Sequence, residues 1–172
     1  DRYEGLKVVD ISDAENPVGV ASIPTGGASW DVDVREPYAY IANGNAGLQV
    51  ADISDPGTPR IIGSCDTPGS ASAITVYKEL ALISDQTAGL QIIDVSDPTS
   101  PTMTGFIETK GRSWSTVARD TLVFLADHSG GLRIINISDP KNPIETAQSK
   151  VGKVYDVDIR GDYAYTATYD SA

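Results

Sequence analysis

Residues 47–59, GLQVADISDPGTP, decide the fold, because close copies of this stretch recur along the whole chain. The copies begin at Gly5, Gly47, Gly89 and Gly131, so their starts are 42 residues apart. A fixed period of this length indicates a repeat protein in which each repeat forms one structural unit. The chain therefore consists of four copies of one unit.

Two further patterns recur with the same period. One has the form WDVDVR, and its copies are WDVDVR at 30–35, SAITVY at 72–77, WSTVAR at 114–119 and YDVDIR at 155–160. The other has the form YAYIA, and its copies start at residues 38, 80, 122 and 163. Short runs rich in Val, Ile, Ala and Tyr, separated by Gly, Pro, Asn and Asp, predict strands, and the helical period of 3.6 residues is absent.

Each repeat thus predicts four strands. We label them A (the WDVDVR pattern), B (the YAYIA pattern), C (the GLQVADIS pattern) and D, the stretch after the last proline, such as 18–23. Four strands of about five residues with short turns fill a repeat of this length. The sequence predicts an all-β fold, a β-propeller built of 42-residue four-stranded blades, with four repeats in one domain spanning 1–172.

An acid or amide closes strand C in every copy, at Asp10, Asp52, Asp94 and Asn136. A repeated carboxylate is a candidate calcium ligand. The alternative is a side chain that accepts hydrogen bonds from the turn backbone. Because asparagine replaces aspartate in the fourth copy, we favour the structural role.

The segments GLQIIDVSDPTSP, GLQVADISDPGTP and YAYIANGNAGLQV resemble the LVIVD repeat of bacterial and archaeal surface and secreted proteins. The resemblance covers all four copies, with departures such as Ala14 at the first turn proline and Ser72 at the aromatic position that opens strand A. It implies a β-propeller and an extracytoplasmic location. The family has no shared catalytic motif, so the resemblance implies no catalytic residue.

The repeats are permuted relative to the blade. The chain opens with strands C and D of one blade at 5–24 and closes with strands A and B at 153–167, with B–C loops expected at 1–4 and 168–172. A two-stranded half-blade is marginally stable and exposes an edge, so the halves are expected to pair. Pairing between two chains would give an eight-bladed homodimer, which we favour. A four-bladed ring within one chain and a piece of a longer protein remain alternatives.

Composition excludes several classes of function. The chain has 24 acidic and 13 basic residues, a net charge of −11, which argues against nucleic acid as a partner. No apolar run is long enough for a membrane helix, so no membrane insertion is expected. With one cysteine, Cys65, and one histidine, neither a disulfide nor a multi-histidine metal site forms within a chain, and we predict no cofactor and no metal.

Strand A carries the first group of candidate binding residues. Asp31 and Asp33 share one face of their strand, as do Asp156 and Asp158, because side chains on a strand alternate between faces. Strand A lines the axis of a propeller, so these acids are candidates for a cation site or a polar pocket. The alternative, which we favour, is that they accept hydrogen bonds from amides of neighbouring blades.

The loop face carries the second group. Aromatic residues that open strand A stand beside polar residues of the B–C and D–A loops; the candidates are Trp30, Trp114, Tyr155, Asp85, Arg112, Asp127 and His128. Flat rings supply contact area and polar groups set orientation, so such a face suits a sugar or a peptide. The alternatives are packing between blades for the aromatics and a plain surface turn for His128.

These observations predict a non-enzymatic binding or scaffold module for protein or glycan ligands, secreted or at the cell surface. The alternative is a propeller enzyme, a hydrolase or lyase acting on glycans, with Asp31 or Asp156 near the axis as the reactive acid.

Overall fold

A computed structural model describes residues 4–169, and in this range it consists of sixteen strands and no helix. Twelve of the strands form three complete four-stranded sheets, each in the order A-B-C-D. The first blade is β3 (Asp31–Arg35), β4 (Tyr38–Ala42), β5 (Leu48–Asp52) and β6 (Arg60–Cys65). The second is β7 (Ala73–Tyr77), β8 (Leu80–Ser84), β9 (Leu90–Asp94) and β10 (Thr102–Ile107). The third is β11 (Ser115–Arg119), β12 (Leu122–Ala126), β13 (Leu132–Asn136) and β14 (Ile144–Ser149).

Four strands form two half-blades, as the permuted repeats predict. The opening half-blade is β1 (Leu6–Asp10) with β2 (Val18–Ile23), and the closing half-blade is β15 (Lys153–Arg160) with β16 (Tyr163–Tyr169). One boundary was wrong: Thr168 and Tyr169, expected in a loop, extend β16 because they pair with the start of β15. Residues 1–3 and 170–172 of the expected loops lie outside the described residues.

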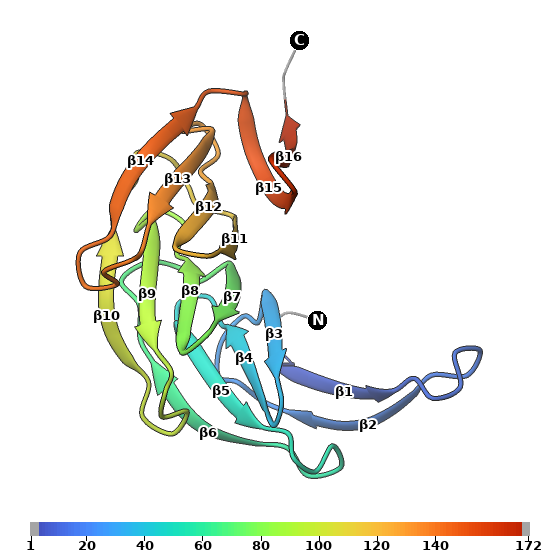
Figure 1. The fold of residues 1–172 in the computed structure, drawn as a ribbon. Coiled ribbons are helices and arrows are strands. Elements are labelled where there is room, and N and C mark those ends of the chain that lie inside the picture. Colours follow the sequence, from blue (N-terminus) through green and yellow to red (C-terminus); the bar gives the residue numbers. More distant parts are fainter. Residues whose placement is uncertain (1–3, 170–172) are drawn as a thin grey trace.

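The blades follow one another around an arc (Figure 1). The A strands β3, β7, β11 and β15 line its concave side, and the D strands lie on the outside. The two half-blades lie at opposite ends of the arc and belong to separate sheets. Residues 4–169 therefore form an open arc, which is not the ring closed within one chain that the sequence left as an alternative.

The hydrophobic core lies between successive blades. Tyr40 and Val50 of the first blade pack in one buried cluster with Ile74, Val76 and Ile83 of the second. Similar clusters join the second blade to the third and the third to the closing half-blade. Because each complete blade is covered on both faces, its B strand is apolar on both faces, which explains the near-continuous hydrophobic runs of the sequence.

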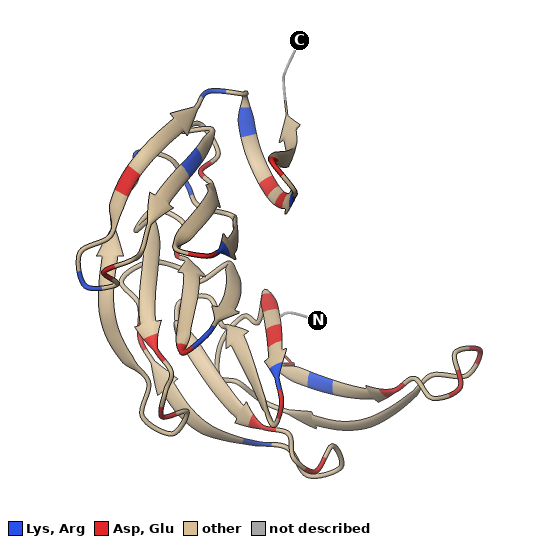
Figure 2. Cartoon of the chain, in the orientation of Figure 1, with Lys and Arg blue, Asp and Glu red and all other residues tan. Residues whose placement is uncertain are grey.

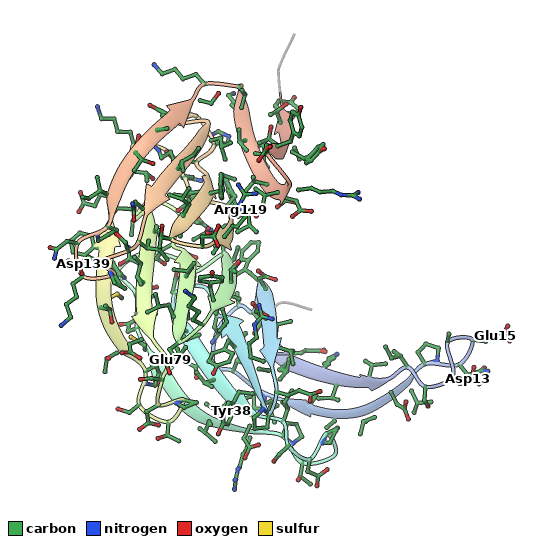
Figure 3. The ribbon with its side chains drawn as sticks, viewed as in Figure 1. Asp13, Glu15, Tyr38, Glu79, Arg119 and Asp139 are labelled. Atoms are coloured by element: carbon green, nitrogen blue, oxygen red, sulfur yellow. The ribbon has the colours of Figure 1, made fainter. Side chains whose placement is uncertain are left out.

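The C–D turns are stabilised within each repeat. Asp10, Asp52, Asp94 and Asn136 accept hydrogen bonds from the amide two residues further on, at 2.8, 3.0, 2.9 and 2.8 Å. The favoured structural role of these residues is confirmed. The hydrogen bonds from Ser54, together with Arg60, lower the pKa of Asp52 to about 2. The labelled side chains Asp13, Glu15 and Asp139 mark these turns at the tips of the hairpins, away from the concave side (Figure 3).

No helix in residues 4–169 is long and apolar enough to cross a membrane.

Candidate functional site

The loop face of the arc is held together by short bridges between blades. Gly44, Gln86 and His128, which occupy the same position in successive B–C loops, pair with Ala71, Ser113 and Val154 at the start of the next A strand. All three loop residues have positive φ, at 57°, 45° and 34°. The position is therefore a strained turn that suits glycine. His128 contributes its carbonyl oxygen, which accepts from Val154 N at 3.1 Å, and its side chain takes no part in the bridge.

Two of these bridges lie beside hollows that differ sharply in their lining. One, of about 440 Å³, lies beside the His128 bridge; we call it the Trp114 hollow, and it is lined by Thr87, Lys110, Gly111, Arg112, Trp114, His128, Ser129 and Tyr155. The hollow of about 460 Å³ beside the Gly44 bridge has Gly26, Ala28 and Gly44 where the Trp114 hollow has Lys110, Arg112 and His128. The same backbone frame therefore carries different side chains.

Three rings line one end of the Trp114 hollow. The Tyr155 ring lies 6.1 Å from Trp114 at 32°, and His128 meets Tyr155 edge-on at 5.0 Å. His128 Nε2 and the Tyr155 hydroxyl share a hydrogen bond of 3.0 Å, which fixes the orientation of the phenol ring. Trp114 Nε1 is buried and has no hydrogen-bond partner within residues 4–169. The rings are thus held in place before any ligand arrives.

The charge of the Trp114 hollow is opposite to that of the chain. Lys110 and Arg112 contribute cations, and the lining contains no carboxylate of the described residues. The chain as a whole carries −11. A local positive region on an acidic protein favours anions at one place and repels them elsewhere. The sequence predicted four of the lining residues as binding residues: Arg112, Trp114, His128 and Tyr155. It did not predict Lys110. The available signal was its place in the D–A loop, where Lys110 and Arg112 lie on either side of Gly111.

Asp85 and Asp127, also predicted at the loop face, lie fully buried beneath it. Asp85 accepts from Thr67 Oγ1 and Gly69 N, both at 2.8 Å, and its burial raises its pKa. Asp127 accepts from Thr109 Oγ1 at 2.6 Å and binds Arg133 at 2.5 Å. Each carboxylate therefore joins the B–C loop of its own blade to the D–A loop that leads into that blade.

A sequence signal for this role exists. Asn43, the first-blade counterpart, accepts from Thr25 Oγ1 at 2.9 Å, so every member of the set binds a threonine 18 residues upstream. A threonine paired at fixed distance with a buried acid or amide indicates a structural contact in a repeat protein. We call these contacts the Thr–Asx latches.

The acids of strand A have two different environments. Asp31 accepts from Ile74 N at 2.9 Å and Asp33 from Val76 N at 2.8 Å, so in the first blade the favoured role as acceptors for the next blade is confirmed. Asp156 and Asp158 in the closing half-blade accept from the following amide of their own strand, at 2.9 and 2.8 Å, as Asp31 also does from Val32 N at 2.8 Å. Within residues 4–169, only the first-blade pair also accepts from amides of a neighbouring blade. The two acidic pairs lie at opposite ends of the concave side, on β3 and β15 (Figure 2). Trp30, the remaining candidate, lines the Gly44-side hollow.

The blades, the repeat period and the turns define an all-β repeat protein of propeller type. The LVIVD repeat matches the chain over residues 1–25, 26–67, 68–109, 110–149 and 151–171. The chain therefore belongs to the LVIVD repeat family, as its sequence predicts. The matched segments also reproduce the three complete and two half-blades.

Solved structures show the same fold at low sequence identity. A protein of unknown function from Desulfotomaculum acetoxidans has a TM-score of 0.80 at 17% identity, over 98% of this chain and 57% of its own. The computationally designed Ika8 protein has a TM-score of 0.70 at 7% identity, over 88% of this chain and 46% of its own. The designed Ika4 protein gives 0.66 at 8% identity, over 86% and 89%. This chain thus spans about half the length of the Desulfotomaculum acetoxidans protein and of Ika8. No curated protein sequence matches it.

Proposed function

We propose that this protein is a non-enzymatic binding module that acts outside the cytoplasm and that the Trp114 hollow takes an acidic glycan. The observation that carries the proposal is the meeting of fixed aromatic rings with Lys110 and Arg112 in one hollow between blades. The extracytoplasmic location rests on the resemblance of the repeats to those of surface and secreted proteins.

The aromatic rings and the charged side chains of the Trp114 hollow would contact different parts of an acidic glycan. The flat faces of Trp114 and Tyr155 suit the apolar face of a sugar ring, which aromatic side chains cover at little entropic cost. A guanidinium forms two parallel hydrogen bonds to a carboxylate, so Arg112 would select a sugar acid over a neutral sugar.

The strand A acids support binding over glycan hydrolysis. In the alternative, Asp31 or Asp156 would act as the reactive acid near the axis, and Asp156 accepts a hydrogen bond from Val157 N. The carboxylates of Asp31 and Asp33 are instead held by backbone amides of the second blade. A carboxylate fixed in this way stabilises the contact between two blades.

Calorimetric titration with oligogalacturonate tests the proposal, with a neutral cello-oligosaccharide and a polyglutamate peptide as comparison ligands. We expect binding of the acidic glycan alone, weakened about tenfold in Arg112→Ala, which corresponds to about 1.4 kcal/mol. Arg60→Ala, an exposed arginine of β6 far along the chain, is the matched control and should bind normally. Equal binding of the neutral glycan, preference for the peptide, or an unchanged Arg112→Ala variant would contradict the proposal. Release of reducing ends during the titration would instead establish an enzyme.

A further inference from the structure

The two half-blades each have an unpaired strand edge. β1 pairs with β2 and β16 pairs with β15, and no other described strand pairs with β1 or β16. The opening half-blade has strands C and D, and the closing half-blade has strands A and B. Each therefore contains the pair of strands that the other lacks.

We propose that two copies of this chain join head to tail, with β16 of one copy pairing with β1 of the other at both junctions. This inference concerns a different region from the Trp114 hollow and does not rest on it. Inside the complete blades, strands B and C pair as Tyr38 with Asp52 and Tyr40 with Val50. The same register in the joined blade places Tyr163 opposite Asp10 and Tyr165 opposite Val8 of the second copy.

Apolar side chains at the two edges are exposed where their counterparts in complete blades are buried. Tyr165 is 59% exposed, whereas Tyr40 at the same repeat position is 4% exposed. On the receiving side Val32 is 45% exposed, and its counterpart Ile74 is 5% exposed. In the complete blades Tyr40 and Ile74 share one core cluster across the blade interface. Seating β16 beside β1 would therefore bring Tyr165 onto Val32 and cover both.

The receiving side also has room for the missing strands. Hollows of about 220 and 260 Å³ lie between β1 and the first complete blade, and both have Leu6 on one side and Val32 on the other. The larger is lined almost entirely by apolar side chains, including Val34, Ala39 and Ile53. Strands A and B fill this place in the complete blades.

Polar groups at the junction are complementary as well. Asp31 and Asp33 accept from Ile74 N and Val76 N across a blade interface, and Arg35 donates to Val76 O at 2.9 Å. Asp156, Asp158 and Arg160 repeat this triplet in β15. Their partners in the joined ring are the backbone groups of Val32 and Val34 in the second copy. In the single chain Val32 N donates to Asp31 of its own strand, at 2.8 Å.

The number of copies follows from blade arithmetic. Propellers have about four to eight blades. Residues 4–169 supply four blade equivalents and form an open arc. Two copies supply eight blades, and three would exceed the range. Two identical head-to-tail junctions related by a two-fold axis close such a ring.

Light scattering on the 172-residue chain is the first test. The expected mass is about twice 18.2 kDa. Tyr165→Asp places a charge in the proposed junction and should give a monomer. Phe106→Asp is the matched control, because Phe106 is 58% exposed on the outer strand β10, and it should leave the dimer unchanged. A monomeric parent chain, an open series of larger polymers, or a dimer that survives Tyr165→Asp would overturn the proposal.

Cross-linking tests the register and does not depend on how the charged variant folds. In a Cys65→Ser background, Lys7→Cys combined with Thr166→Cys places two thiols opposite each other if β16 pairs with β1 as proposed. Directly paired residues on neighbouring strands are close enough for a disulfide. We expect a covalent dimer under oxidation. Lys7→Cys combined with Ala164→Cys is displaced by two residues and should not cross-link. Equal cross-linking of both pairs, or of neither, would contradict this register.

Discussion

The second complete blade and the closing half-blade have the same sequence pattern in strand B and opposite environments. In β8 the side chains are buried from Ala81 to Ser84, whereas in β16 all but Thr166 are exposed. Leu82 and Tyr165 occupy the same repeat position, yet Leu82 is fully buried and Tyr165 is largely exposed. The difference shows that the sequence of a propeller strand does not by itself determine whether its side chains are buried. Its burial comes from strand C beside it and from the blades on its two faces.

The largest expected effect is loss of a core side chain in a complete blade. Leu82→Ala removes a fully buried side chain between the second and third blades, and we expect a loss of about 2–5 kcal/mol in the free energy of unfolding. The matched change Tyr165→Ala, measured at protein concentrations where the chain is monomeric, should cost no more than about 0.5 kcal/mol, as for an ordinary surface site. Urea denaturation followed by tryptophan fluorescence measures both. Equal losses would mean that β16 is packed as tightly as β8 in the single chain.

The Thr–Asx latches give the next effect. Asp127→Asn replaces a buried carboxylate that binds Arg133, and the loss of this charged hydrogen bond should cost about 1.5–3 kcal/mol. Asp85→Asn should cost little, because Asn43 already fills the equivalent place in the first blade. In the closing half-blade the position is Thr168, so no equivalent change is possible there.

Asp85→Asn also tests how the stability of the chain depends on pH. Burial raises the pKa of Asp85, so its contribution to stability is present below the pKa of an unfolded aspartate, about 3.9, and is lost as pH rises through the folded pKa. The difference in stability between Asp85→Asn and the parent chain should therefore shift in favour of the variant as pH rises from 4 to 7. A constant difference between the two proteins over this range would contradict the shift.

Close approach between complete blades predicts a third effect. A Cβ at Gly63 in β6 would lie 2.2 Å from the carbonyl oxygen of Pro98 in the second blade. Gly63→Ala therefore forces the blades apart, and we expect a loss of about 1–3 kcal/mol. Gly19→Ala in β2 of the opening half-blade is the control, because a Cβ there meets no atom within 4 Å. Melting temperatures of the two variants would separate them, and a neutral Gly63→Ala would show that the blade interface adapts.

The smallest effect should be the same in half-blade and complete blade. Hydrogen bonds from Ser12 and Ser54 lower the pKa values of Asp10 and Asp52, and that of Asp52 falls to about 2. Their contributions are present above the unfolded pKa of about 3.9 and are lost as pH falls through the folded values. Asp10→Asn and Asp52→Asn should each make the loss of stability between pH 5 and pH 2 slightly shallower. Acid titration of circular dichroism measures this, and a steeper loss in either variant would argue against these turn contacts.

Contacts within one repeat could be read from the sequence. The period of 42 residues, the four strands, their order and the split blade follow from the recurring patterns, and the turn role of Asp10, Asp52 and Asp94 follows from the asparagine at 136. These features depend on strand alternation and on hydrogen bonds over two or three residues. Such interactions are complete inside a single copy, so every copy displays them.

Contacts between repeats were decided by the tertiary structure. The sequence placed Asp85 and Asp127 with His128 at the loop face, and the structure buries the two acids beneath it while His128 reaches Tyr155. Asp31 and Asp156 are identical in pattern, and both accept from the following amide of their own strand, but Asp31 also accepts from Ile74 N of the next blade. The physical reason is that the position of the next blade determines which side chain meets which backbone. The repeat specifies a blade, and the neighbouring blade determines whether a given side chain becomes core, latch or binding surface.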